Sequence, residues 1–284
     1  MVYLLLAAAI VFNASQNFIT KQYNLKTKKP NTYIYTAVVA FFAMLFFAVT
    51  SGGKFEFNIH IMGYSAVFAL FYSMATVGTV QAIRIGPLSI TALLNQCSLI
   101  IPTLFGLVVL NDDVSNIGCI GIAALFAALV LVNPKSSDNK KKVSSKWFLW
   151  VIVGFVGNGM CSTVQKLQQL KYDGGYKNEF MTVALFIVFV LMLAAAKMNK
   201  SDLKRDIIGA MKYASLNGVA TGACNMLIMV LTALLPTAVL FPSVSAGGMI
   251  LTFIISLMVY KEKLSPKQLI GYTIGVISII LINI

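Results

Sequence analysis

Six apolar segments of the chain carry hydrogen-bonding side chains at the spacing of one helix face. Steps of three, four and seven residues place the members of each set on the same side of a helix. Amides and hydroxyls in such positions either bond to neighbouring helices or line a wet cavity that binds a small polar solute. The sets are Asn13, Asn17 and Thr20; Tyr72, Thr76 and Thr79; Thr91, Asn95 and Ser98; Asn158, Ser162 and Gln165; Asn217, Thr221 and Asn225; and Ser245, Thr252 and Ser256.

The number of amides favours the cavity, because six asparagines in otherwise apolar segments are more than helix packing requires. Asn95, Asn158 and Asn225 lie near the middle of their segments and are the strongest individual candidates. The predicted substrate-binding set is Asn13, Asn17, Tyr72, Thr76, Asn95, Ser98, Asn158, Ser162, Asn217, Asn225 and Ser245.

Three charged residues could also contact a solute. Lys21 and Lys166 end two apolar segments at matching positions. A lysine there is usually an interfacial anchor that snorkels, but it could hold an anionic group. Glu179 begins a segment, where the helix dipole favours an acid whether or not it has a coupling role. No acid lies deep in any segment, so no mid-membrane carboxylate is offered for proton exchange.

Aromatic side chains leave a second kind of solute site open. Tyr64, Tyr72 and Tyr213 could form a cation–π site for an ammonium compound, although core packing is the commoner role of each.

Other chemistries lack the residues that they need. The four cysteines lie in apolar segments without CxxC spacing, and His60 is the single histidine, so no metal, cofactor or disulfide is expected. A nucleotide-binding GxxxxGK[ST] motif is absent, which argues against a primary pump. A lipid-modifying enzyme would need interfacial carboxylates or histidines, and Asp112 with Asp113 is an isolated pair. We therefore expect no enzymatic activity.

Two segments contain interior prolines. Pro102 and Pro242 lie inside apolar segments, and Gly247 with Gly248 follows the second of them. We expect these two helices to be kinked or partly broken, which would free backbone carbonyls to face a ligand or simply bend the helix.

The amino-acid composition indicates a protein that is embedded in lipid. Of 284 residues, 58% are hydrophobic and 11% are charged, against roughly 25% charged in soluble domains. The mean hydropathy is +0.84. Nearly all of the 22 basic residues fall between apolar segments, so they indicate membrane topology and not nucleic-acid binding.

Ten segments approach the length of about 20 residues that crosses a bilayer. The predicted spans are 2–20, 31–50, 60–82, 87–110, 115–133, 147–167, 179–197, 210–232, 236–260 and 266–283. Basic residues concentrate after the odd-numbered spans, so the positive-inside rule places those loops in the cytoplasm and both termini outside. The expected location is the plasma (cytoplasmic) membrane, with both the lipid bilayer and a solute as partners.

The two halves of the sequence repeat each other. Tyr64 and Tyr213, like Pro87 and Pro236, are 149 residues apart. We predict a five-span repeat at 1–133, a Lys-rich cytoplasmic linker at 134–146 and a second five-span repeat at 147–284. Because each half has an odd number of spans, the fold class is an all-α membrane protein of ten helices in two inverted repeats, an architecture used for alternating access.

The closing segments of both halves carry a family resemblance. They are AIRIGPLSITALLNQCSLIIPTLFGLVVLNDDVSNIGCIGIAALFAALVLVN and LPTAVLFPSVSAGGMILTFIISLMVYKEKLSPKQLIGYTIGVISIILIN, each with a Pro-led span, a charged turn and a Gly-containing last span. The chain resembles the drug/metabolite transporter superfamily, in particular its ten-span members with two EamA-type domains. It departs from that pattern in having Asp113 where the family often has Glu, and in a charge bias that places the termini outside.

The resemblance and the polar sets together predict a secondary transporter. It would move a small polar metabolite or amine through a central cavity between spans 1, 3, 4, 6, 8 and 9. A non-transporting scaffold or subunit is the alternative, and a lipid-modifying enzyme is a weaker one. Gly271 and Gly275 offer a close-packing helix face, which leaves a homodimer open.

Overall fold

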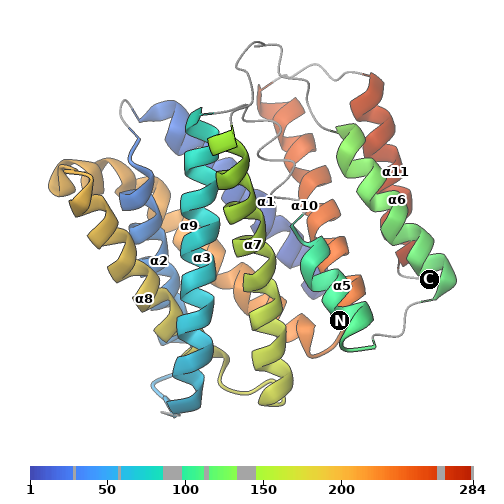
Figure 1. Ribbon diagram of the computed structural model, residues 1–284, viewed down its shortest axis with the longest axis horizontal. Helices are drawn as coiled ribbons and strands as arrows, with labels where there is room; N and C mark the ends of the chain where they lie inside the picture. Colours follow the sequence, from blue (N-terminus) through green and yellow to red (C-terminus); the bar gives the residue numbers. More distant parts are fainter. Residues whose placement is uncertain are drawn as a thin grey trace. The chain divides into compact units, whose positions relative to one another are not determined.

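The fold was analysed in a computed structural model, which describes residues 1–27, 30–56, 59–85, 98–111, 115–132, 145–260 and 266–282. These residues form helices joined by short connections, and they contain no strand. The helices are α1 (Val2–Lys26), α2 (Thr32–Thr50), α3 (Ile59–Ile85), α5 (Ile100–Val108), α6 (Asn116–Val132), α7 (Ser145–Lys171), α8 (Lys177–Met198), α9 (Leu203–Thr232), α10 (Thr237–Tyr260) and α11 (Pro266–Ile282) (Figure 1).

Six of these helices are long and apolar enough to cross a membrane. They contain the stretches Val2–Asn24, Thr32–Thr50, Ile59–Thr79, Ser145–Lys171, Lys177–Met198 and Leu203–Thr232. The expected all-helical class is therefore confirmed for the described residues, and several of their helices could span a membrane. The count of ten spans and the inverted repeat remain predictions.

Local chemistry sets where two of the long helices begin. Asn31 precedes α2 and accepts a hydrogen bond at Oδ1 from the backbone N–H of Ile34 at 3.3 Å. Asp202 precedes α9 and accepts one at Oδ1 from the backbone N–H of Arg205, also at 3.3 Å. Both side chains satisfy N–H groups that have no partner within the first turn of a helix.

The fourth predicted span is helical only from Ile100 onward within the described residues. A turn at Ser98 and Leu99 precedes α5, which places Pro102 in the first turn of the helix. A proline there costs no helix hydrogen bond, so Pro102 does not interrupt α5. The helix α10 runs unbroken through Pro242, Gly247 and Gly248, so the helix is not broken at that proline.

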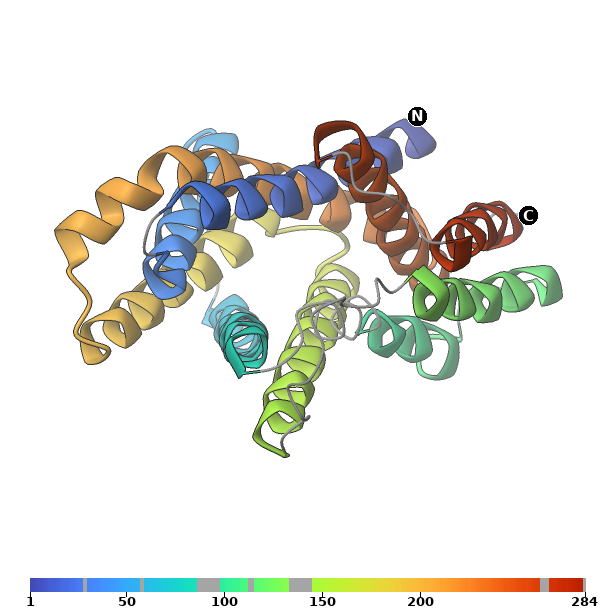
Figure 2. The ribbon, with the colours of Figure 1, turned by 90° about the horizontal axis from the view of Figure 1, so that it is seen from above.

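The chain divides into two compact units, and each contains helices from both halves of the sequence. Unit 1 comprises residues 1–73 and 164–233, and unit 2 comprises residues 74–163 and 234–284. In unit 1, α9 packs against α1 and α2, and α2 also packs against α8 (Figure 2). In unit 2, α6 lies beside α11, and α10 contacts α5, α6 and α11 (Figures 1 and 2).

Glycines allow close approaches between helices in both units. A Cβ atom placed on Gly218 of α9 would lie 2.5 Å from Phe42 Cβ and 2.7 Å from the carbonyl oxygen of Val39. In unit 2, a Cβ on Gly78 of α3 would lie 2.4 Å from the backbone nitrogen of Gly154 in α7. Real Cβ atoms do not come so near, so these crossings depend on glycine.

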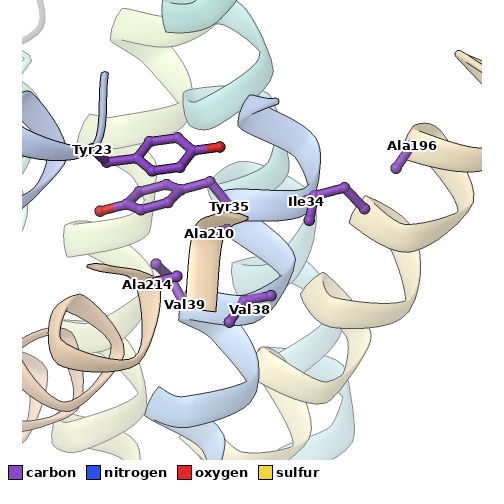
Figure 3. Packing of buried hydrophobic residues seen from close by; sticks show 8 residues of the cluster. All are labelled: Tyr23, Ile34, Tyr35, Val38, Val39, Ala196, Ala210 and Ala214. Carbon is purple, nitrogen blue, oxygen red and sulfur yellow. The ribbon is translucent and has the colours of Figure 1, made fainter. Parts of the chain in front are cut away.

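One cluster of buried side chains fills the contact between α1, α2, α8 and α9 (Figure 3). Tyr23 and Tyr35 stack with ring centroids 4.3 Å apart, and Tyr213 is tilted against Tyr23 at 6.3 Å. The other members are smaller: Ile34, Val38, Val39, Ala196, Ala210 and Ala214. The aromatic stack thus occupies the space that the small residues leave.

Two sets of loops meet at opposite ends of unit 1. At one end Asn31, before α2, donates from Nδ2 to Ser201 Oγ and to Asp206 Oδ2, both at 2.8 Å, which joins the α1–α2 and α8–α9 connections. At the other end Thr50 Oγ1 donates to Asn178 Oδ1 at 3.2 Å, which joins the end of α2 to the start of α8.

Candidate functional site

Unit 1 holds a buried amide that three helices surround. Asn217 of α9 is 5% exposed, and its Nδ2 donates to Tyr35 OH of α2 at 2.8 Å and to Thr20 Oγ1 of α1 at 3.2 Å. The two hydroxyls are themselves 3.2 Å apart. The close crossing at Gly218 is next to this amide, so the absent side chain brings α2 near enough for the Tyr35 hydroxyl to reach it.

The polar contact between α1 and α9 continues one turn further along both helices. Thr221 Oγ1 donates to Gln16 Oε1 at 3.0 Å. Gln16 and Thr20 are four residues apart in α1, as Asn217 and Thr221 are in α9, so matching faces of the two helices meet.

A second polar cluster in unit 1 joins α7 to α9. Gln165 of α7 is 3% exposed, and its Nε2 donates to Asn225 Oδ1 of α9 at 2.7 Å. The Nδ2 of Asn225 donates to the Thr221 carbonyl at 2.9 Å. Lys166, next to Gln165, is 6% exposed, and its Nζ donates to the carbonyl oxygen of Thr232 at 2.7 Å. Thr232 is the last residue of α9, where the helix dipole favours a cation.

Unit 2 has a polar contact of its own. Asn158 of α7 donates from Nδ2 to Ser98 Oγ at 2.7 Å, at the turn before α5. A Cβ on the neighbouring Gly159 would lie 2.6 Å from the Ser98 carbonyl oxygen and 2.5 Å from the Cδ1 of Ile101. Glycine at 159 therefore lets the start of α5 rest on α7, and the amide bonds to it there.

Several buried oxygen atoms have no hydrogen-bond partner among the residues that the structure describes. In unit 1 these include Asn217 Oδ1 and Gln169 Oε1, and in unit 2 they include the hydroxyls of Thr237, Ser243 and Ser245. Buried polar atoms are usually paired, so unpaired acceptors point to water or a solute as the missing donor.

The predicted binding residues therefore fall into distinct groups. Asn217 joins Thr20, Asn225 joins Gln165, and Asn158 joins Ser98, each within one unit. Asn13, Tyr72, Thr76 and Ser162 are partly buried, and Ser245 is buried with an unpaired hydroxyl. Asn95 lies outside the described residues, as do the side chains of Asn17 and Lys21.

The charged candidates differ in their surroundings. Glu179 lies in the first turn of α8, as the helix-dipole argument predicts, and its Oε1 accepts from the backbone N–H of Glu56 at 3.3 Å. Lys166 differs from the expected interfacial anchor. Its side chain is buried, and its ammonium group donates a hydrogen bond within unit 1. The ammonium group bonds to the carbonyl oxygen of Thr232 at the C-terminus of α9, where an interfacial anchor would contact lipid headgroups.

Sequence reasoning missed part of both clusters in unit 1. Tyr35 lies in a span that appears apolar nearly all round, and nothing in the local pattern marks its hydroxyl as a partner of Asn217. Gln165 belongs to the predicted polar set with Asn158 and Ser162, but it is not among the predicted substrate-binding residues. Gln168 and Gln169, both buried, carry the same signal of amides in an apolar segment.

Comparisons with known proteins inform the fold and not the activity. No family model matches the chain, and no curated protein matches it. Among solved structures, a crystal structure of a protein without a functional name is similar over the whole of this chain and 98% of its own, with a TM-score of 0.80 and 11% sequence identity. This chain therefore shares its fold with a protein of experimentally determined structure.

Proposed function

We propose that the protein is a secondary transporter that moves a small polar solute by alternating access. The observation that carries the proposal is the concentration of buried amides and hydroxyls on α7 and α9, where the acceptor Asn217 Oδ1 has no partner among the described residues. Polar groups in membrane-spanning helices are costly, and they mark substrate pathways more often than lipid-facing surfaces.

The proposal includes ten spans in two inverted repeats and membership of the drug/metabolite transporter superfamily. The helix pairing supports the repeat. α1 packs against α9, and their predicted counterparts α7 and α3 approach closely at Gly78 and Gly154. α2 packs against α9, and its counterpart α8 meets α3 where Ser65 Oγ donates to the Phe180 carbonyl at 2.9 Å. Inverted repeats of this kind suit alternating access.

A non-transporting scaffold is the second candidate. Its supporting observation is that Asn158, Asn225 and Asn217 all bond to neighbouring helices, which is what polar packing residues do. A scaffold would co-purify with a stable partner, and no solute would change its thermal stability. Unpaired acceptors are not explained by packing, so we favour transport.

Reconstitution tests the proposal directly. Protein in liposomes is expected to show saturable uptake or counterflow of a small polar solute. Asn158→Ala and Asn95→Ala are each expected to lower the uptake rate, because both remove amides from the proposed pathway. Asn199→Ala is the matched control, since this exposed amide bonds only to the Ala195 carbonyl of its own helix among the contacts described.

Two outcomes would count against the proposal in different ways. Uptake that is unchanged in both variants removes Asn95 and Asn158 from the pathway. Liposomes that show no saturable flux for amino acids, amines, nucleosides or sugar phosphates, together with a stable co-purifying partner, favour the scaffold.

A further inference from the structure

Two lysines are held at the same end of unit 1, beside the connection between α7 and α8. Lys166 Nζ donates to the carbonyl oxygen of Thr232, and Lys177 Nζ donates to the carbonyl oxygen of Gly174. Lys166 is buried and Lys177 is half-buried. Each ammonium is thus oriented by a backbone carbonyl.

The connecting loop places further groups around these lysines. Asp173, Gly174 and Tyr176 all have positive φ, which folds the loop back on itself. A Cβ placed on Gly174 would lie 3.4 Å from Lys177 Nζ, 3.8 Å from Ala233 Cβ and 4.0 Å from Gln169 Oε1. Ala233 directly follows Thr232, so the anchor points of both lysines adjoin this loop.

The electrostatics of this end favour an anion. Lys177 is the first residue of α8, where the helix dipole already makes a cation unfavourable, and Tyr176 before it provides no capping side chain. The buried charge of Lys166 adds to this potential. Three acids also lie at this end: Asp173, Glu56 and Glu179. Asp173 and Glu56 are exposed, so solvent screens their charges more than that of the buried Lys166, and Glu179 accepts from the backbone N–H of Glu56. An anionic group between the lysines would relieve the positive potential.

The same end also requires a hydrogen-bond donor. Gln169 is 2% exposed, its Nε2 donates to Gln168 Oε1, and its own Oε1 has no partner within the described part of the chain. Sulfate carries only acceptors and leaves this oxygen unpaired. A carboxylic acid with a neighbouring amine or hydroxyl supplies both the negative charge and the donor.

We propose that Lys166, Lys177 and Gln169 form a binding site for a small carboxylate that carries an adjacent amine or hydroxyl group. The inference rests on the proposed transport function and names the substrate class for it. The carboxylate bonds to the two ammonium groups, and the donor bonds to Gln169 Oε1. Bare organic cations are repelled from the site.

Thermal unfolding of the full chain in detergent tests the site. The probes are the twenty amino acids, lactate and glycerate. Each hit is compared with its primary amide, with the amine that lacks the carboxylate, and with inorganic sulfate, which has no hydrogen-bond donor. At least one amino or hydroxy acid is expected to raise the melting temperature in a concentration-dependent manner, while its amide and amine do not. Lys177→Gln and Lys166→Gln are each expected to weaken apparent affinity about tenfold, the effect of one charge-assisted hydrogen bond.

Matched variants separate the site from a general effect of charge. Lys171→Gln removes the same charge from an exposed position at the end of α7, and affinity is expected to stay within about twofold. Gln169→Leu is expected to reduce the preference for an amino or hydroxy acid over the unsubstituted acid. Should Lys166→Gln not fold, Lys177→Gln carries the test, because Lys177 is at a helix end.

Several results would overturn the site. Amides, amines or sulfate that stabilise the protein when carboxylates do not would exclude a carboxylate site, as would unchanged affinity in Lys177→Gln. Liposome uptake of a solute without a carboxylate, with the same kinetics in Lys177→Gln, would leave transport standing and remove only this site. If no probe stabilises the protein and no solute is taken up, the proposed function fails as well.

Discussion

At the scale of single residues, the side-chain amide of Asn217 is hydrogen-bonded to described residues at only one of its two polar atoms. Tyr35 and Thr20 both contact Nδ2 of the amide, and Oδ1 has no partner in the described ranges. Turning the amide over exchanges the two atoms and leaves a donor unpaired in place of an acceptor. An unpaired buried group costs about 1–3 kcal/mol. Asn217 is therefore a costly packing residue, and a solute or water that completes its bonding accounts for it better.

A double-mutant cycle measures how much of the Asn217 contact is structural. Tyr35→Phe keeps the stack on Tyr23 and removes the hydroxyl that accepts at 2.8 Å. Asn217→Leu removes the donor. We expect a coupling of about 0.6 kcal/mol between the two changes in the free energy of unfolding in detergent, typical of a hydrogen bond between membrane helices. Tyr3→Phe, at an exposed position on α1, should have no effect, and strictly additive losses would mean that the bond contributes nothing.

At the scale of helices, glycines decide which faces can meet. Gly218 and Gly222 are one turn apart in α9, and α2 covers both with Val39, Phe42 and Phe46. The polar contact of Asn217 with Tyr35 depends on this approach, because a wider separation would carry the hydroxyl away from the amide. Packing and polar bonding between α2 and α9 are therefore a single structural unit.

Gly218→Ala tests this dependence. The added Cβ would meet Phe42 Cβ at 2.5 Å and the Val39 carbonyl oxygen at 2.7 Å, and neither a Cβ nor a backbone oxygen can move away by side-chain rotation. We expect a loss of about 1–3 kcal/mol in the free energy of unfolding, the usual cost of overpacking. Gly209→Ala in the same helix is the control, since a Cβ there meets nothing within 4 Å and helix propensity should stabilise it by up to about 1 kcal/mol. Equal effects of the two changes would contradict a tight crossing.

The helices themselves could largely be predicted from sequence, and their polar contacts only in part. Hydrophobic runs predict α2 and α8 to within two residues at each end, because an apolar stretch bounded by polar residues has one stable conformation in lipid. α9 begins at Leu203, seven residues before the predicted start, because the Asp202 cap extends it through a polar turn that hydropathy does not register. The burial of Lys166 depends on tertiary structure, because its partner is the last residue of α9. The contact between Tyr35 and Asn217 likewise depends on how closely α2 approaches α9.

At the scale of the whole molecule, the loops that meet at each end of unit 1 are those that the charge rule assigns to one side of the membrane. The end joined by Asn31 and Asp206 belongs to connections after predicted spans 1 and 7, and the end joined by Thr50 and Asn178 to connections after spans 2 and 6. The first end has Lys26, Lys197, Lys200, Lys204 and Arg205 against Asp202 and Asp206, while the second has Lys54, Lys171 and Lys177 against Glu56, Asp173 and Glu179. This asymmetry supports an orientation with the first end in the cytoplasm.

Cysteine labelling distinguishes the two orientations. In a background without the native cysteines, Lys54→Cys and Lys204→Cys remove the same charge at exposed positions on opposite ends of unit 1. We expect a membrane-impermeant maleimide to label position 54 in intact cells, and position 204 only after permeabilisation. The opposite result would invert the topology and place the carboxylate site, which lies at the same end as Lys54, on the cytoplasmic side. In that case the same two lysines would receive solute from inside the cell.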